Sequence, residues 1–491
     1  MPGRGYRFVA DVKRREDAST RTGISSVSSS KTIAVLPFMP LVAEYRDAAL
    51  EMGMADTLIA RLSNIREVVV RPINSVRKYA ELDQDPLAAG QELGVESVLE
   101  ESIQRWGNYI RVTVRLVNVP TGASLWTGTF DERFTNIFAV QDAIAEKVAG
   151  ALALRFSGEE KQRLIKRHTE NAEAYELYLR GRYHFVKLIP SETQKGISYF
   201  KRAIEIDPAY ALAHVGLADA YRSLALADDM PATEVFPKAK AAAQKAVAID
   251  DTLAEAHAVL GFTITWYDWD WRTAEQQYKR ALELNPNSAT THWAYAHLLS
   301  NTGRHAEALA EIRRARELDP LNLIINAGEG LYLLHAGQTD EALARLQQTS
   351  ELDPNYWLAH LFTSSAYIEK GMYPEAVAEA RKARALSGVS SQPTAYEGYA
   401  LAKSGRQREA RVVLEQLLKL STERYVPPYY IALVYNGLGE RDETFAWLER
   451  GVAQRDPKLT FLKVEPKWNN LRDDPCFTAI LKHMSLDAPS N

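Results

Sequence analysis

Hydrophobic positions follow two different patterns along the chain. From residue 32 to about 156, short apolar runs typical of strands alternate with amphipathic stretches typical of helices. The run TIAVLPF at 32–38 predicts a buried strand, and 52–63 predicts a helix because Met54, Leu58 and Leu62 recur at helical spacing. Beyond residue 172 the helical period dominates. The pattern therefore predicts an α/β domain at 32–156 followed by an all-α region, and a mainly α fold overall.

Turn residues separate the other elements of the first domain. Gly94 ends a predicted helix, and Trp106, Gly107 and Asn108 interrupt two strand-like runs, so these two runs predict a hairpin. The remaining predicted elements are strands at 67–70, 97–105, 109–118 and 125–130 and helices at 87–93 and 137–156.

The all-α region repeats itself every 34 residues. Small residues dominate the positions five and twelve after the glycines of the series, and Pro286, Pro320 and Pro354 close units in the same frame. Small side chains let two antiparallel helices approach closely, and proline stops the second helix. We count about eight units from 172 to 457, and we expect 458–491 to cap the array. The glycines that mark the period are Gly303, Gly337, Gly371, Gly405 and Gly439.

Composition and charge narrow the classes of protein. Of the 491 residues, 59 are basic and 63 acidic, and the net charge of -4 argues against a general binder of polyanions. A single cysteine, Cys476, excludes an intramolecular disulfide and predicts a reducing compartment. Residues 13–31 are polar and Ser-rich, which predicts a flexible linker after the short segment 1–12. Because no signal sequence or run of about 18 apolar residues is present, we predict a cytoplasmic protein without a membrane partner.

No catalytic motif stands out in the sequence. A phosphate-binding loop, an HExxH helix, a GxSxG elbow and the kinase signatures are all missing. His292 and His297 lack the spacing of a metal motif, and solvent exposure is the simplest interpretation of paired acids such as Asp473 and Asp474. We therefore predict a protein that is not an enzyme and that holds no cofactor and no metal.

The repeat columns, in segments such as AEALAEIRRARELDP and DEALARLQQTSELDP, resemble the tetratricopeptide family. Residues 32–152 resemble the amino-terminal domain of TolB as it occurs in bacterial signalling proteins, through KTIAVLPF, GMADTLIARLS and TNIFAVQDAIAEKVAGAL. The chain departs from that pattern at Glu101, where glycine is usual, and at 39–51. The start PGRGYRFVADV resembles the last wing strand of OmpR/PhoB-type winged-helix regulators, so 1–12 would be the remnant of that domain.

The tetratricopeptide resemblance implies where a partner would bind. In this family the first helix of each pair lines a concave groove that suits an extended or helical peptide. Each of these side chains could instead pack on its neighbours or decorate the surface. The aromatic run at 266–271 could likewise be a recognition site, but we expect it to fill the space where Trp269 replaces the glycine between helices. The predicted groove residues are Trp293, His297, Asn301, Leu331, His335, Leu361, Ser365, Glu369, Tyr399, Lys403, Tyr429 and Asn436.

The order of the three resemblances is similar to that of CadC-like regulators, without a membrane helix in the linker. It implies a non-enzymatic signalling or transcription-regulatory protein, a truncated DNA-binding regulator whose repeats bind a partner protein or peptide. DNA binding would need an upstream winged helix, of which Arg4, Gly5, Tyr6 and Arg7 would be the remnant. Two alternatives stay open, namely the non-catalytic half of a protein kinase or nucleotide cyclase and a stand-alone interaction scaffold. Homodimer formation also stays open.

Overall fold

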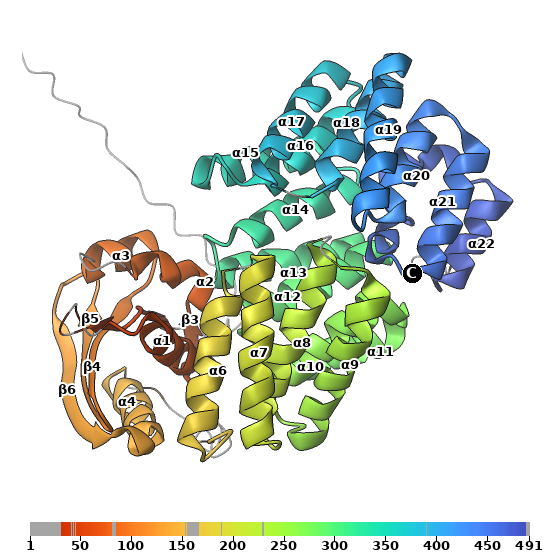
Figure 1. Ribbon diagram of the computed structural model, residues 1–491. Helices are drawn as coiled ribbons and strands as arrows, with labels where there is room; N and C mark the ends of the chain where they lie inside the picture. The colour runs from red at the N-terminus through yellow and green to blue at the C-terminus, as the bar shows by residue number, and fades with distance from the viewer. Residues whose placement is uncertain are drawn as a thin grey trace, which may run out of the picture.

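A computed structural model of the chain shows a small sheet domain joined to a long curved array of helices (Figure 1). The structure describes residues 31–487 except 41, 43, 45, 81–84, 153, 155–165, 188, 228, 229 and 389. The segments predicted at 1–12 and 13–31, including Arg4, Gly5, Tyr6 and Arg7, lie outside the described residues except for Lys31, which begins the first strand.

The sheet domain carries one mixed sheet in the order β3-β1-β4-β5-β6, with β2 paired to β4. β1 runs parallel to β3 and β4, and β4, β5 and β6 form an antiparallel meander. The strands are β1 Lys31–Val35, β2 Met39–Pro40, β3 Val68–Val70, β4 Ser97–Trp106, β5 Tyr109–Asn118 and β6 Ser124–Arg133. The helices and turns are α1 Ala48–Ser63, α2 Ile73–Val76, η2 Arg77–Tyr79, α3 Pro86–Glu92, η3 Phe134–Asn136 and α4 Ile137–Ala151.

Strand β5 alternates as expected for a sheet with one buried face. Ile110, Val112 and Val114 are fully buried, whereas Arg111 and Arg115 point to solvent. Glu101 breaks the rule in β4, because its side chain is 3% exposed and neither carboxylate oxygen has a hydrogen-bond partner. Burial raises the pKa of Glu101 well above its usual value, with the Glu100 charge adding to the effect.

The array consists of eight successive antiparallel helix pairs in the described chain. Each pair is joined to the next by a short connection, so the pairs stack into a curved superhelix. The pairs are α6 Ala172–Phe185 with α7 Pro190–Ile206, α8 Ala211–Leu226 with α9 Ala232–Ile249, α10 Ala254–Thr263 with α11 Trp271–Leu284, α12 Ala289–Asn301 with α13 His305–Leu318, α14 Leu323–His335 with α15 Thr339–Leu352, α16 Trp357–Glu369 with α17 Tyr373–Leu386, α18 Gln392–Lys403 with α19 Gln407–Glu423, and α20 Pro428–Leu438 with α21 Arg441–Ala453.

The repeated residues have the roles that helix packing requires. Gly303 and the other four turn glycines of the series have φ between 70° and 87°, which is the left-handed conformation that ends the first helix. In the third pair Trp269 takes this conformation, with φ 61°, after the π-helical turn η4 Ile264–Asp268. The alanines five positions after the first four glycines, such as Ala308 and Ala342, are completely buried at the helix crossings. The predicted mainly α fold with a repeat array is confirmed.

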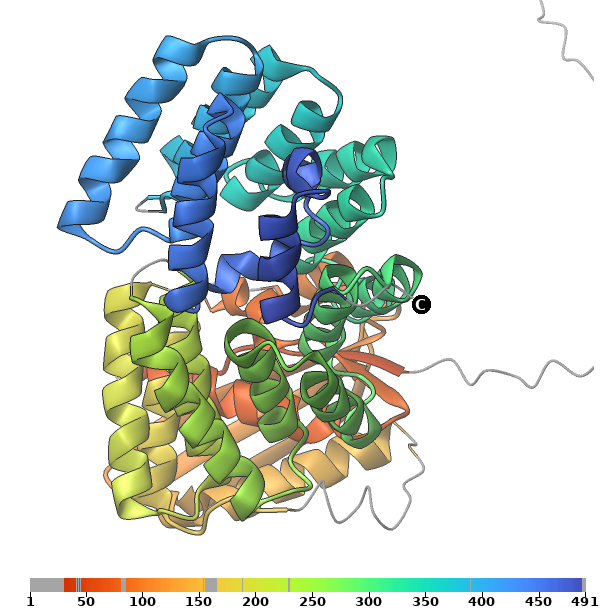
Figure 2. The ribbon, with the colours of Figure 1, turned by 90° about the vertical axis from the view of Figure 1, so that its right-hand side faces the viewer.

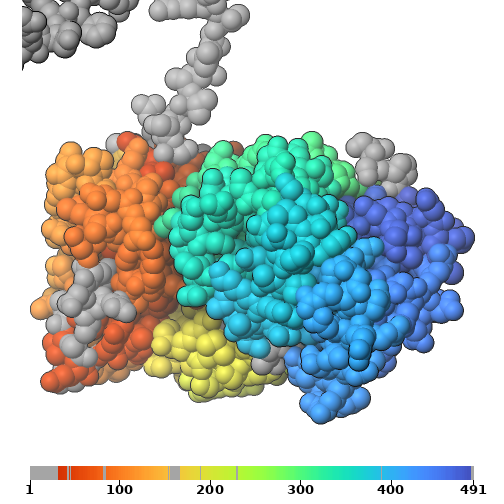
Figure 3. All heavy atoms as spheres, turned by 90° about the horizontal axis from the view of Figure 1, so that it is seen from above, coloured from red at the N-terminus to blue at the C-terminus, as the bar shows by residue number. Residues whose placement is uncertain are grey.

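The sheet domain packs against the array at two places (Figures 1 and 3). α1 crosses α6 so closely that a Cβ atom on Gly53 would lie 2.7 Å from Cβ of Leu179. At the second place, Arg71 donates from Nη1 to the carbonyl oxygen of Leu318 (2.6 Å), and Asn287 donates from Nδ2 to the carbonyl oxygen of Val68 (2.9 Å). The α1 helix therefore fixes the first pair, and the β3 end of the sheet fixes the middle pairs.

The last residues of the chain fold back inside the curve of the later repeats, as Figure 2 shows. Two short 3-10 turns, η5 Pro457–Phe461 and η6 Pro466–Leu471, lead to the final helix α22 Pro475–His483. The final helix α22 packs against α21 of the last pair. We call residues 456–472 the inner segment. The capping role expected for 458–491 therefore does not describe the inner segment.

Candidate functional site in the concave groove

The inner segment begins with an aromatic contact to three successive first helices. The ring of Phe461 lies edge-on to the rings of His297 (5.2 Å between centroids), Trp266 (5.9 Å) and His335 (6.1 Å). Trp266 also stacks on His297 at 4.3 Å. Burial, with a smaller electrostatic effect of the neighbouring His335 and Lys458 side chains, lowers the pKa of His297 to about 3. His297 is therefore neutral at physiological pH and packs as an aromatic ring.

A buried ion pair holds the middle of the inner segment. The side chains of Lys467 and Glu465 are 1% and 2% exposed, and Lys467 Nζ lies 2.6 Å from Glu465 Oε1. Lys467 Nζ also donates to Ser365 Oγ (2.9 Å) and lies 4.4 Å from the ring centre of Tyr396. Burial opposes both charges, but their mutual attraction outweighs it, so the pKa of Glu465 is lowered and that of Lys467 is raised. Both groups are charged inside the groove.

The far end of the inner segment is held by hydrogen bonds from the last two pairs. Trp468 is fully buried, and its Nε1 donates to Tyr429 Oη at 2.9 Å. The carbonyl oxygen of Lys467 accepts from Asn436 Nδ2 (2.8 Å) and from Tyr399 Oη (3.2 Å). These contacts involve both the backbone and the side chains of the inner segment, as contacts to an extended peptide in a repeat groove do.

The structure corrects the expectation of an open groove. The chain's own residues 456–472 occupy the concave face, so six of the predicted groove residues are buried beneath them. Without the inner segment, the apolar side chains of this surface would be exposed to water, which is unfavourable. The inner segment buries them and supplies hydrogen-bond partners for the polar groups beside them. The six residues are His297, His335, Ser365, Tyr399, Tyr429 and Asn436.

The other predicted groove residues do not grip the inner segment. Trp293 packs against Phe262, with 6.0 Å between ring centroids, and Asn301 hydrogen-bonds His297. Leu331 and Leu361 are buried in the core, and Glu369 and Lys403 are exposed at the ends of their helices. The helical register does not separate positions that face the groove from positions that face the neighbouring pair.

The predicted groove residues omit several array side chains that contact the folded-back C-terminal part of the chain. Trp266 and Tyr396 contact the inner segment, and Trp271 Nε1 donates to the carbonyl oxygen of Met484 at 2.7 Å. The run at 266–271 was expected to fill the space of a missing turn, and Trp269 does occupy the turn position. The available signal for the inner segment was a stretch with prolines, Phe461 and Trp468 that lacks a helical period.

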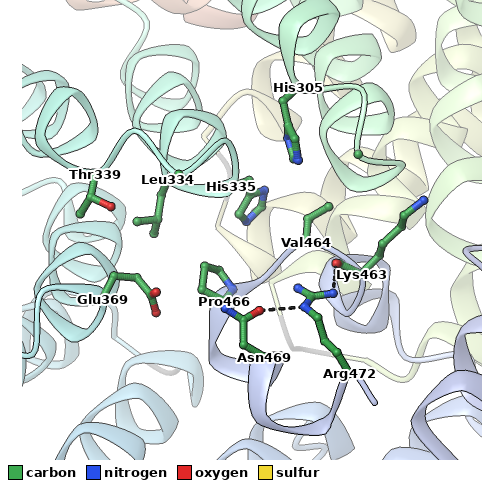
Figure 4. Close-up of a pocket in the computed structure, with 12 residues that line it drawn as sticks. His305, Leu334, His335, Thr339, Glu369, Lys463, Val464, Pro466, Asn469 and Arg472 are labelled. Atoms are coloured by element: carbon green, nitrogen blue, oxygen red, sulfur yellow. Dashed lines mark hydrogen bonds between the residues drawn. The ribbon is translucent and has the colours of Figure 1, made fainter. Parts of the chain in front are cut away.

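A cavity of about 320 Å³ remains between the inner segment and the repeats (Figure 4). His305 and His335 point into it from the array, and Arg472 faces them from the inner segment. Arg472 donates from Nε to Asn469 Oδ1 at 2.8 Å, and burial lowers the pKa of both Arg472 and Lys463. The cavity is lined mainly by polar groups, so it suits water or a small polar molecule.

The first pairs of the array present their concave face to the sheet domain. Arg182 on α6 donates from Nε to Asp56 Oδ2 on α1 (2.7 Å), and Tyr175 Oη donates to Thr57 Oγ1 (3.1 Å). A second cavity, of about 280 Å³, lies between α1 and this face. The two halves of the concave surface are therefore covered by two different parts of the same chain.

The described residues offer no grouping for metal chemistry, since nowhere in them do three His, Cys, Asp or Glu side chains come together as a metal site would need. The histidines instead have structural partners: His292 bonds from Nε2 to the carbonyl oxygen of Pro286 (3.0 Å), and His360 does the same with Pro354 (2.9 Å). None of the helices in the described ranges combines the length and apolar character needed to cross a bilayer.

Comparisons with known proteins agree with the repeat array. Two tetratricopeptide-repeat family models match residues 270–324 and 328–390. A putative adenylate cyclase 3 from Rhizobium meliloti is 30% identical over 240 residues, which are 48% of this chain; the chain spans 40% of that relative's length. Solved structures with likeness include Pseudomonas aeruginosa pilF, at 23% identity, 41% of this chain, 91% of that chain and a TM-score of 0.32. Another is human IFIT1, solved as a dimer with m7Gppp-AAAA. It is 14% identical, and the match covers 64% of this chain and 77% of that chain with a TM-score of 0.43.

The chain therefore contains tetratricopeptide repeats, as the period of 34 residues predicts. Repeats of this kind bind protein partners through their concave surface. The predicted class of the array is confirmed.

Proposed function

We propose that this protein is a non-catalytic signalling scaffold whose later repeats bind a partner peptide where the inner segment now lies. The observation that supports it most directly is the grip on residues 465–468, in which Ser365, Tyr399, Tyr429 and Asn436 contact side chains and backbone together. The preferred peptide carries a Lys-Trp pair with an acidic residue two positions before the lysine. Such a partner has to displace the inner segment.

A competition measurement tests this function. A fluorescent peptide with the sequence of residues 456–472 is titrated into full-length protein and into a Lys467→Ala/Trp468→Ala variant. The inner segment of this variant binds the concave groove more weakly because it lacks both side chains. We expect the variant to bind the peptide at least about tenfold more tightly, because a tethered competitor acts at about millimolar effective concentration. Adding Asn436→Ala and Tyr429→Phe should weaken that binding again. A variant that keeps its helical circular dichroism and binds no peptide contradicts the proposal.

The wider role of the scaffold is also a proposal. The relative described as a putative adenylate cyclase favours a chain that shares its non-catalytic part with a signalling enzyme. The resemblance to TolB-like domains and winged-helix regulators favours transcription regulation instead. Binding of promoter DNA by the chain extended with upstream in-frame sequence, compared with the present chain, separates the two roles: a shift by the extended chain alone supports the regulator.

A further inference from the structure

The outermost strand of the sheet has no strand partner on one side. β6 is the edge strand of the described sheet, and it runs for ten residues with its outer side exposed (Figure 1). Long edge strands present free N–H and C=O groups and are usually protected by proline, lysine or a covering element. β6 contains neither proline nor lysine, and Leu125 is 43% exposed.

The central five residues of β6, WTGTF at 126–130, are nearly the same in both directions about Gly128. Thr127 and Thr129 flank the glycine, and Trp126 and Phe130 follow on either side. Thr127 and Thr129 are exposed, whereas Trp126 and Phe130 turn to the half-buried face. Their rings close over Gly128, where an added Cβ would lie 2.5 Å from Trp126 Cζ2 and 3.4 Å from Phe130 Cε2. A strand with this symmetry suits antiparallel pairing with an identical strand.

We propose that β6 pairs with β6 of a second copy of this chain, on a two-fold axis through Gly128. In this register each Trp126 lies opposite Phe130 of the other copy, and each Thr127 lies opposite Thr129. Aromatic pairs and threonine pairs are among the favourable cross-strand neighbours in antiparallel sheets. The interface is isologous and closes at two copies, and it does not depend on the groove.

The charges of β6 fit this register. Asp131, Glu132 and Arg133 stand at one end of the strand, and the two-fold axis places Asp131 and Glu132 opposite Leu125 and Ser124. No like charges face each other directly. Asp131 is already paired within its own sheet, because Arg111 Nε donates to it at 2.6 Å. A two-fold axis through Thr129 instead would place Glu132 opposite Trp126, which is less favourable.

Charge variants at the exposed threonines test both the dimer and its register. Full-length wild type should sediment as a dimer at micromolar concentration. Thr127→Glu/Thr129→Glu places two pairs of glutamates opposite each other, so the dimer Kd should rise by at least about tenfold. Thr127→Glu/Thr129→Lys places glutamate opposite lysine and should restore the dimer, while circular dichroism stays unchanged in both variants.

Three results would overturn the proposal. A wild type that stays monomeric well above micromolar concentration excludes the pairing, because the proposal expects a dimer at micromolar concentration. Equal dimerisation of the wild type and the double-glutamate variant places the interface elsewhere. Failure of the glutamate–lysine variant to recover the dimer contradicts the two-fold axis through Gly128. If β6 instead pairs with a strand of another protein, the purified chain stays monomeric, which is the first of these results.

Discussion

Lys467 Nζ donates a hydrogen bond of 2.9 Å to Ser365 Oγ, although 102 residues separate them in sequence. The lysine belongs to the inner segment, and the serine lies on the first helix of the sixth pair. Together with the Glu465 carboxylate, this contact converts the concave face of a repeat array from an open surface into a buried, charged interior.

Lys467→Met should destabilise the protein strongly. The substitution leaves the Glu465 carboxylate buried without its counter-ion, which costs about 3 to 5 kcal/mol. Glu465→Gln in the same chain should recover much of the loss, because no unpaired charge remains. The free energies of unfolding of the wild type, Lys467→Met, Glu465→Gln and the double variant, measured in urea, give the coupling energy between Lys467 and Glu465. Lys419→Met, at an exposed lysine, is the control and should change stability by no more than about 0.5 kcal/mol.

Acidification should weaken the packing around His297. Its pKa is lowered to about 3, so the unfolded chain takes up a proton below about pH 6.5 while the folded chain does not. The contribution to stability is therefore complete above pH 6.5 and is lost as the pH falls towards 3. Between pH 7 and 5 the wild type should lose about 2 kcal/mol more than His297→Gln. If the free energies of unfolding of the wild type and of His297→Gln in urea depend on pH in the same way, the pKa of His297 is not lowered in the folded protein.

Glu101→Leu should stabilise the protein at pH 7. The raised pKa of Glu101 means that the folded chain holds a neutral acid where the unfolded chain ionises, so this residue destabilises the fold increasingly as the pH rises above about 4.5. Removing an unpaired buried polar group should gain at least about 1 kcal/mol. The gain should shrink at pH 4.5. Glu100→Leu, which removes an ion pair at the surface, should give no comparable gain.

Asp56→Ala should loosen the sheet domain from the first helix pair. It removes the partner of Arg182, whose pKa is raised by Asp56 despite its burial, and it should cost about 2 to 4 kcal/mol. Small-angle scattering should show a larger radius of gyration if the domains separate. Glu409→Ala breaks an exposed pair with Arg406 and should leave both the free energy of unfolding and the scattering nearly unchanged. Similar losses in both variants would argue against a specific role for Asp56.

The repeat architecture could be predicted from the sequence because its signals are local. Gly303 and its equivalents mark turns that need positive φ, and Ala308 and its equivalents mark close helix crossings, so both can be recognised from the 34-residue period alone. Trp269 shows the limit, since a tryptophan takes the turn conformation that the pattern assigns to glycine.

The candidate site could be predicted only in part. The helical register identifies His335, Ser365 and Asn436 as concave residues, and these three do contact the inner segment. Their partners lie between 31 and 126 residues away along the chain, and no local pattern encodes such pairings. The polar character of Lys467 and Glu465 also predicts exposure, which the buried ion pair overrides.

A photo-cross-link from the centre of the inner segment tests the occupied groove most directly. p-Benzoylphenylalanine in place of Trp468 reacts with whatever lies beside it in the full-length protein. We expect an intramolecular link to α20 near Tyr429, identified by mass spectrometry of the digested monomer, with loss of that link when excess peptide of residues 456–472 is added to a Lys467→Ala background. Links that form only between chains, or none to the first helices of the later pairs, would contradict the account.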